Sequence, residues 1–249
     1  MRGVISAVVV VCLFGPVTTA VAQGGYSGAV SLVRSHGEGI DQNDTVYFLN
    51  SIDVTLGRIR ATAMLPVLSQ KTVWSTAPGL TPQPSTWSGT VGDPMVRADV
   101  AVAGRHQGPW SVSLNSAVKI PVADAETGLG SGEFDSAYGV TFAGSRGRSS
   151  YLIDVSYWVL GDPADVEYRD VPALYVGYAT ILGNGYRWSA MAGLAGSGSV
   201  APGLDPPVQF NVGILRALRS RVAIGATVGI GLTDTAADWT AGVSWRVGF

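Results

Sequence analysis

The stretch that decides the fold is Asp238-Trp239-Thr240-Ala241-Gly242-Val243-Ser244-Trp245-Arg246-Val247-Gly248-Phe249. Apolar residues fill every second position, and polar or small residues fill the positions between them. Side chains of a β-strand point alternately to its two faces. The pattern therefore predicts a strand with one apolar face and one polar face, which finishes on an aromatic residue. Such a strand is typical of the last strand of an outer-membrane β-barrel.

The amino-terminal residues indicate export. Arg2 supplies a positive charge, residues 4–13 are apolar, and Ala20-Val21-Ala22 forms a cleavage site of small residues. We expect residues 1–22 to be a cleaved signal peptide, because the segment is too short for a transmembrane helix. Residues 23–249 then form a single barrel domain. The one cysteine, Cys12, falls in the signal peptide, so we expect a mature chain without disulfides.

The composition excludes several classes of protein. After the signal peptide no run of eighteen apolar residues remains, so we expect no transmembrane helices. Charged residues make up 14% of the chain and the formal net charge is -2, which argues against a nucleic-acid partner. The 33 glycines suit tight turns and close backbone approach more than helices. We predict neither a cofactor nor a bound metal.

Strand patterning recurs in twelve segments, which predicts an all-β, antiparallel up-and-down barrel of about twelve transmembrane strands. The predicted strands are 26–34, 45–56, 58–67, 95–104, 109–120, 134–143, 149–160, 172–180, 186–195, 207–217, 220–232 and 238–249. The alternation is clearest in 109–120 and 220–232, whereas the facing of three strands is ambiguous: 26–34, 172–180 and 186–195.

The connections between these segments support the barrel. Short turns alternate with longer connections, which are 35–44, 68–94, 121–133, 161–171, 196–206 and 233–237. An outer-membrane barrel has short periplasmic turns and longer outer loops. We therefore expect the outer membrane of a Gram-negative-type bacterium. A soluble β-sandwich would also alternate, but its apolar faces would turn inward, and it gives no reason for this rhythm of connections.

Several short motifs, taken in order, resemble a known family. They are Leu56-Gly57-Arg58-Ile59-Arg60 with Leu65-Pro66, Gly89-Thr90-Val91-Gly92-Asp93, Lys119-Ile120-Pro121, Gly128-Leu129-Gly130-Ser131-Gly132-Glu133-Phe134-Asp135, Gly161-Asp162, and Gly231-Leu232-Thr233-Asp234 through Asp238-Trp239. In this order they resemble the outer-membrane transporter family known as the MetA-pathway of phenol degradation. The resemblance implies a β-barrel that passes small, often aromatic, hydrophobic compounds across the outer membrane.

The candidate functional surface is the inward face of the barrel. Arg or Lys facing lipid near the bilayer midplane would be destabilising by about 2–4 kcal/mol, so we expect the strand charges to point inward. The predicted lumen-facing residues are Asp53, Arg60, Arg97, Asp99, Asn115, Lys119, Asp154, Trp158, Arg187, Gln209, Asn211 and Arg246. They either form ion-paired ladders that fill the lumen or build a polar constriction that selects solutes.

Aromatic residues divide between the two faces. Most lie near strand ends on outward positions, as an interfacial girdle would require; these are Trp110, Tyr151, Trp188, Trp239, Trp245 and Phe249. Tyr47 and Trp158 are predicted to face inward, where they could stack on an aromatic solute. By analogy with other barrels, Trp245, Val247 and Phe249 are expected to be the signal that the barrel assembly machinery recognises.

Three functions remain open at this point. The favoured one is a channel or transporter for small molecules, whose partners are outer-membrane lipid, the assembly machinery and a solute. The second is a structural or surface-interaction barrel with a closed lumen. The third is a membrane enzyme, for which His36 beside Ser35 and Glu38 is the candidate base. Asp124, Glu126, Glu133 and Asp135 could hold Ca²⁺, although acidic loop residues are usually only solvated.

Overall fold

The computed structural model describes residues 24–37, 40–74, 83–84, 86–106, 108–123, 130–163, 167–185 and 187–249. The predicted signal peptide lies outside these residues. In the described part of the chain, no helix is long and apolar enough to cross a membrane.

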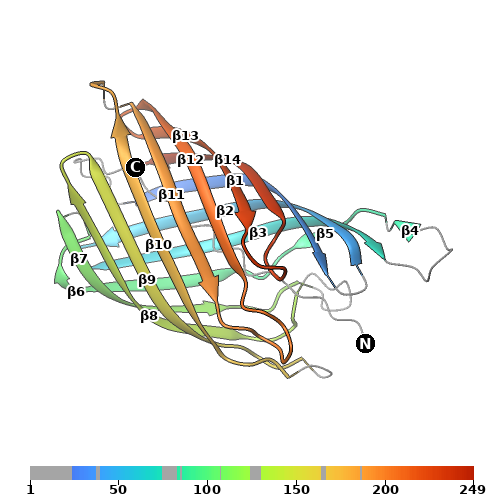
Figure 1. The fold of residues 1–249 in the computed structure, drawn as a ribbon. Helices are drawn as coiled ribbons and strands as arrows, with labels where there is room; N and C mark the ends of the chain where they lie inside the picture. The colour runs from blue at the N-terminus through green and yellow to red at the C-terminus, as the bar shows by residue number, and fades with distance from the viewer. Residues whose placement is uncertain are drawn as a thin grey trace.

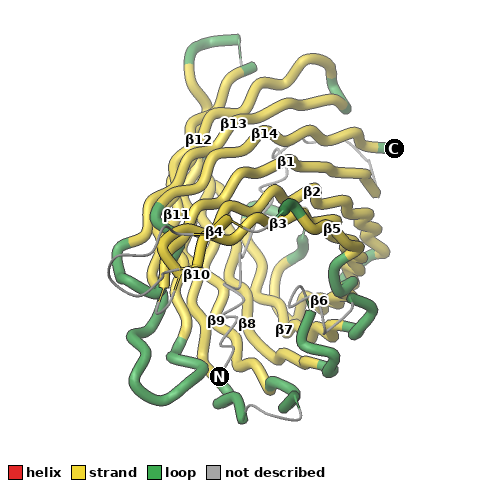
Figure 2. Tube along the Cα trace, turned by 90° about the vertical axis from the view of Figure 1, so that its right-hand side faces the viewer, coloured by secondary structure: helices red, strands yellow, loops and turns green. Residues whose placement is uncertain are grey.

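Twelve strands close into an antiparallel barrel (Figures 1 and 2). They are β1 (Gly24–Gly37), β2 (Ile40–Leu56), β3 (Ile59–Trp74), β6 (Met95–Gly104), β7 (Trp110–Lys119), β8 (Asp135–Arg146), β9 (Ser149–Val159), β10 (Val171–Leu182), β11 (Trp188–Ser197), β12 (Val208–Arg219), β13 (Val222–Gly231) and β14 (Trp239–Gly248). Each barrel strand pairs with its neighbour along the chain, and β14 pairs with β1 to close the wall. The predicted fold class is therefore confirmed.

The first three strands are longer than the barrel wall. Figure 1 shows β1, β2 and β3 running past the other strands, with β4 (Gln83–Pro84) and β5 (Ser88–Val91) beside the extension. β5 pairs with β3 through Val67 and Val91. The predicted loop over residues 35–44 is wrong, because β1 and β2 extend into it and pair up to Gly37 and Ile40. Its polar residues suggested a loop, but a hairpin beyond the hydrocarbon layer can be polar on both faces. The predicted loop over 68–94 is wrong in its first part, because β3 continues to Trp74 in pairing with β2.

The two ends of the barrel differ. At one end, here called the turn end, lie the connections 57–58, 105–109, 147–148, 183–187 and 220–221, together with Gly24 and Phe249. Gly57, Gly147 and Gly183 adopt positive φ in these turns, a conformation that glycine reaches without steric conflict. The opposite end, here called the loop end, carries the longer connections and the β1–β2–β3 extension. This arrangement matches the predicted alternation of short and long connections.

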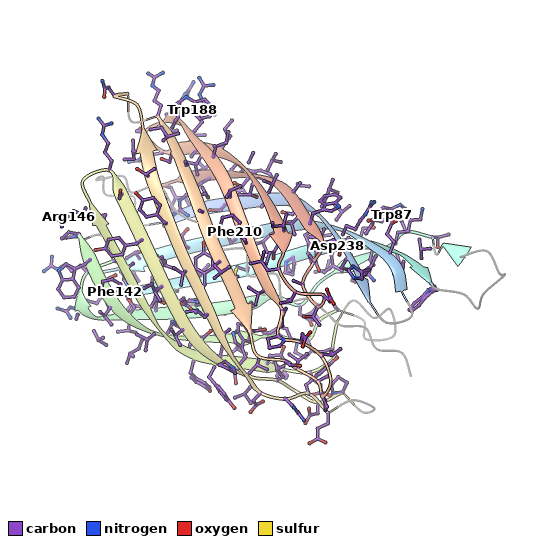
Figure 3. All side chains as sticks on the ribbon, in the orientation of Figure 1. Trp87, Phe142, Arg146, Trp188, Phe210 and Asp238 are labelled. Carbon is purple, nitrogen blue, oxygen red and sulfur yellow. The ribbon has the colours of Figure 1, made fainter. Side chains whose placement is uncertain are left out.

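Burial alternates along the strands and fixes which face points inward. On β7, Asn115 is 7% exposed, whereas its neighbour Leu114 is 53% exposed. Inward side chains lie on the concave face and are covered by their neighbours there, whereas outward side chains are not. The outward set is mostly Val, Ile, Leu and aromatic residues, including Phe142 and Phe210, which are labelled in Figure 3. A continuous apolar exterior of this kind fits contact with lipid.

The structure also settles the facing of β1, which the sequence leaves ambiguous. Ser27 and Ala29 are buried and point inward, whereas Leu32 points outward and is exposed. The next inward position toward the turn end is Gly25, and on the outward side Gly28 lies under the ring of Trp245. β1 is therefore a wall strand whose small residues accommodate side chains from β14.

Candidate functional site

The main polar cluster of the lumen forms around Arg97 on β6. Its guanidinium donates hydrogen bonds to Asp99 at 2.9 Å, Asp154 at 2.6 Å and Thr141 at 2.9 Å. Thr141 in turn donates to Asp154 at 2.6 Å. Asn115 donates to Thr141 at 2.9 Å and to Asp154 at 3.3 Å. Four adjacent strands, β6 to β9, thus supply one cation, two carboxylates and two neutral polar groups to a single network.

Local sequence makes room for this cluster. Gly139 on β8 is the cross-strand partner of Asn115. A Cβ at Gly139 would lie 2.9 Å from the side-chain oxygen of Asn115 and 2.5 Å from the backbone oxygen of Val155. Only glycine fits there without displacing these groups. The glycine therefore helps to hold Asn115 in position for Thr141 and Asp154.

A second ion pair lies where the barrel closes. Arg246 on β14 donates two hydrogen bonds to Asp53 on β2, at 2.6 and 2.9 Å, and one to Ser27 on β1 at 3.1 Å. A Cβ at Gly25 would lie 2.7 Å from the guanidinium. A side chain at that position would therefore displace Arg246. The pair joins the strands on both sides of the closing seam.

A third cluster lies at the loop end. The Lys119 ammonium is 2.6 Å from Asp135 and 3.6 Å from Asp93, and it donates to Ser131 at 2.6 Å. Asp93 also accepts the backbone N–H groups of Val122 and Ala123, both at 2.8 Å. Asp135 also accepts the backbone N–H of Gly161 at 3.0 Å. One partly buried lysine therefore ties together the connections that precede β6, β8 and β10.

The remaining predicted residues are less tightly connected. Arg60 is the cross-strand partner of Asp99 and lies 3.5 Å from the Thr55 hydroxyl. Asn211 lies over Gly229, where its oxygen would contact an added Cβ. Trp158 is half-buried on the inward face of β9. Arg187 belongs to the exposed connection before β11, so the structure does not place it among the wall residues.

The structure adds residues that the sequence alone did not single out. Thr141 and Ser27 complete the two ion-pair networks, and Asp93 joins the Lys119 cluster. Thr141 and Ser27 occupy inward positions of alternating strands, but only the cross-strand register shows which charges they meet. Asp135, predicted as a candidate Ca²⁺ ligand, instead pairs with Lys119; Asp124 and Glu126 lie outside the described residues.

The candidate catalytic histidine has a different partner from the one suggested by sequence. His36 contacts the carboxylate of Asp238 through Nδ1, and both side chains are substantially exposed. The contact joins the extension of β1 to the connection before β14 at the loop end. Among the described residues, no group of three potential ligands is arranged to bind a metal ion.

Comparison with solved structures identifies membrane channels of the same architecture. The crystal structure of an outer membrane channel from Pseudomonas putida F1 superposes with a TM-score of 0.67 at 10% identity, covering 91% of this chain and 94% of that chain. The NanC porin gives 0.59 at 7% identity, covering 90% and 100%. The CymD monoaromatic hydrocarbon channel gives 0.52 at 9% identity, covering 91% and 88%.

Sequence comparison adds no closer relation, since no family model and no curated protein matches the chain. At identities of 7 to 10%, the structural similarity indicates the architecture of the chain but not its substrate. The apolar exterior, the polar inward face and the paired closing strands agree with that architecture. The chain therefore has the fold of the outer-membrane β-barrels, a class to which channels and porins belong.

Proposed function

We propose that this protein is an outer-membrane channel for small molecules in a Gram-negative-type bacterium. The observation that carries the proposal is the Arg97 network, an ordered set of hydrogen-bonding groups on one wall of a closed barrel. Polar constrictions of this kind set solute selectivity in channels. The short turns of the turn end then face the periplasm, and the loop end faces the outside.

The wall opposite the Arg97 network supports a pathway for solutes. In the closed order of strands, β12, β13, β14 and β1 face β6 to β9. Many of their inward positions are small, among them Gly213, Ala223, Gly225, Thr227, Gly229, Gly242, Ser244 and Ala29, although Gln209, Asn211 and Arg246 also face inward on this wall. Small side chains opposite a polar network leave more of the cross-section to a solute than two large faces would.

The solute class that we propose is small and hydrophobic or aromatic, carrying a polar group. The resemblance to the MetA-pathway family suggests such solutes, and one structural neighbour is a monoaromatic hydrocarbon channel. The inward face also carries an aromatic ring within reach of polar groups: Trp158 on β9 is half-buried, whereas Tyr175 on β10, the cross-strand partner of Asp154, is buried. A phenol-like molecule could stack on a ring while its hydroxyl bonds to the Arg97 network.

Transport is tested by conductance and uptake. The purified, folded barrel should give discrete channels in planar bilayers and should admit phenol into liposomes. Neutralising two charges of the network, by Arg97→Gln with Asp154→Asn, should change the ion selectivity and lower the uptake of phenol. The matched control is Arg34→Gln, which lies on the outward face near the loop end. Absence of channels and of uptake in the folded wild-type protein contradicts the proposal.

A closed structural barrel is the second candidate. It is favoured by the density of ion pairs, since Arg97, Lys119 and Arg246 are all bonded to carboxylates and could fill the lumen. The same bilayer experiment separates the two functions. A closed barrel should show no conductance in the wild type but should acquire it when Arg97 and its partners are truncated to alanine.

Export and assembly complete the proposal. Residues 1–22 would be removed on export, and amino-terminal sequencing of the mature protein should begin at Gln23. Trp245, Val247 and Phe249 would form the signal for the assembly machinery. In the folded barrel the backbone N–H of Phe249 bonds to the carbonyl of Gly24 at 3.0 Å. Deletion of Phe249 should lower the yield of folded barrel in cells more than its stability in detergent.

A further inference from the structure

Arginines are concentrated in the turns of the turn end. Seven occur in the five connections and the residues that border them: Arg58, Arg105, Arg146, Arg148, Arg187, Arg219 and Arg221. These segments contain neither aspartate nor glutamate. The sequence between strands at the loop end has the reverse composition, with twelve acidic residues and a single basic one, Arg169. The charge of the protein is thus sharply divided between its two ends.

All seven turn arginines are exposed in the structure. Exposed aromatic side chains on the outward face lie near them at the strand ends, namely Trp110, Tyr151, Trp188 and Phe249. Aromatic residues mark the level where hydrocarbon gives way to lipid headgroups. The turn arginines therefore lie at the headgroup level. Figure 3 shows Arg146 and Trp188 at the ends of their strands.

The direction of two arginines supports contact with lipid. Arg146 follows the outward parity of β8, which includes Tyr138, Val140 and Phe142. Arg216 is not in a turn but lies on β12, inside Arg219. Its guanidinium is 5.1 Å from the ring centre of Trp188, on the outward face. In contrast, two arginines near this end point into the lumen: Arg246 holds Asp53, and Arg60 lies beside the Thr55 hydroxyl. The cations of the turns are therefore placed around the barrel and not gathered at its axis.

We propose that the turn arginines bind the phosphodiester headgroups of anionic phospholipids in the leaflet at the turn end. A guanidinium presents a planar set of N–H donors that matches phosphate oxygens. Basic residues at a membrane surface are attracted to anionic lipid over about one Debye length. Since the arginines are spread over five turns, no single small anion in solution could contact them together, whereas a ring of lipids could. The proposal depends on the orientation of the barrel but not on transport.

The experiment measures lipid retention by native mass spectrometry of the folded barrel in detergent. The protein is incubated with phosphatidylglycerol or with phosphatidylcholine, and the bound lipids are counted. The wild type should retain phosphatidylglycerol preferentially. Two variants, R146Q/R148Q and R219Q/R221Q, should each lose part of this preference, and the fourfold variant should lose it by roughly tenfold. The control is R34Q/R169Q, which removes cations from the loop end and should retain the preference.

The outcomes separate lipid from other anions. Excess inorganic phosphate should leave phosphatidylglycerol bound, because a free ion lacks the acyl chains that pack on the aromatic girdle. Equal retention of the two lipids by the wild type would overturn the proposal, as would an equal loss in the control. Unchanged lipid retention with a shifted reversal potential would instead assign the arginines to ions at the pore mouth. Heat-modifiable gel mobility verifies that each variant is folded.

Discussion

Arg246 on the last strand holds Asp53 on the second strand through two hydrogen bonds of 2.6 and 2.9 Å, although 193 residues separate them in sequence. Both side chains are largely covered, and β1 passes between them with Ser27 as a third partner. The pair therefore bridges the seam at which the barrel closes. It can form only after β14 has docked against β1.

The seam pair should contribute measurably to stability. Asp53→Ala would leave the Arg246 guanidinium in the wall without its carboxylate, and should lower the free energy of unfolding by about 2–3 kcal/mol. This figure is below that for a fully buried pair, because both groups retain some exposure. Denaturant unfolding of Asp53→Ala, Arg246→Ala and the double variant gives the coupling energy. Strictly additive effects would show that the pair does not stabilise closure.

The glycine under Trp245 offers a second test of the seam. A Cβ at Gly28 would lie 2.3 Å from the indole ring. Gly28→Ala should therefore displace Trp245 and lower stability by about 1–3 kcal/mol, the usual range for overpacking. Gly185→Ala is the control, because nothing lies within 4 Å of a Cβ at that position. Near-ultraviolet circular dichroism should report the altered indole in the first variant alone, and equal stability of the two variants would contradict the expectation.

Lys119 should hold the loop end together. Lys119→Met would remove the cation shared by Asp93 and Asp135, whose carboxylates are mostly buried. We expect the connections before β6 and β8 to become cleavable by proteases in the folded barrel, with faster cleavage than in the wild type. Lys71→Met, a change of the other lysine, is the control. Identical cleavage of the two variants would show that Lys119 does not tie these connections.

His106 should make stability depend on pH. Burial, together with the positive charge of Arg60, lowers the pKa of His106 below its ordinary value of 6.5. The unfolded chain then binds a proton at a higher pH than the folded chain does. Stability is complete above the unfolded pKa and decreases as the pH falls below 6.5 toward the folded value. Unfolding transitions at pH 7.5 and 5.0 should differ less for His106→Gln than for the wild type.

A larger pH effect in His106→Gln than in the wild type would contradict this assignment. The ring of His106 also bonds to the backbone oxygen of Arg58 at 3.0 Å, joining two connections at the turn end. Glutamine can replace that hydrogen bond without titrating. The variant therefore separates the effect of protonation from the loss of the contact.

Much of the fold follows from local pattern. The alternation in 109–120, 149–160, 220–232 and 238–249 assigns the lipid and lumen faces of those strands, because each side chain faces opposite to its neighbour. The same pattern does not predict the extended pairing of β1 with β2. Outside the hydrocarbon layer both faces of a strand can be polar, so the sequence there shows no alternation. Arg187 is a second residue that the pattern misplaces. The alternation of β11 extends to this residue in the sequence, but in the structure Arg187 lies in the turn before the strand begins.

For the strands with clear alternation, the sequence by itself determined which residues would meet lipid and which would meet the lumen, because that choice depends on a period of two along each strand. Only the tertiary structure decided which inward residues meet one another. Arg97 and Asp154 are 57 positions apart, and Arg246 and Asp53 are 193 apart. Their contacts depend on strand register and on closure of β14 against β1. Those are set by the pairing and packing of all twelve strands together, and no local segment encodes them.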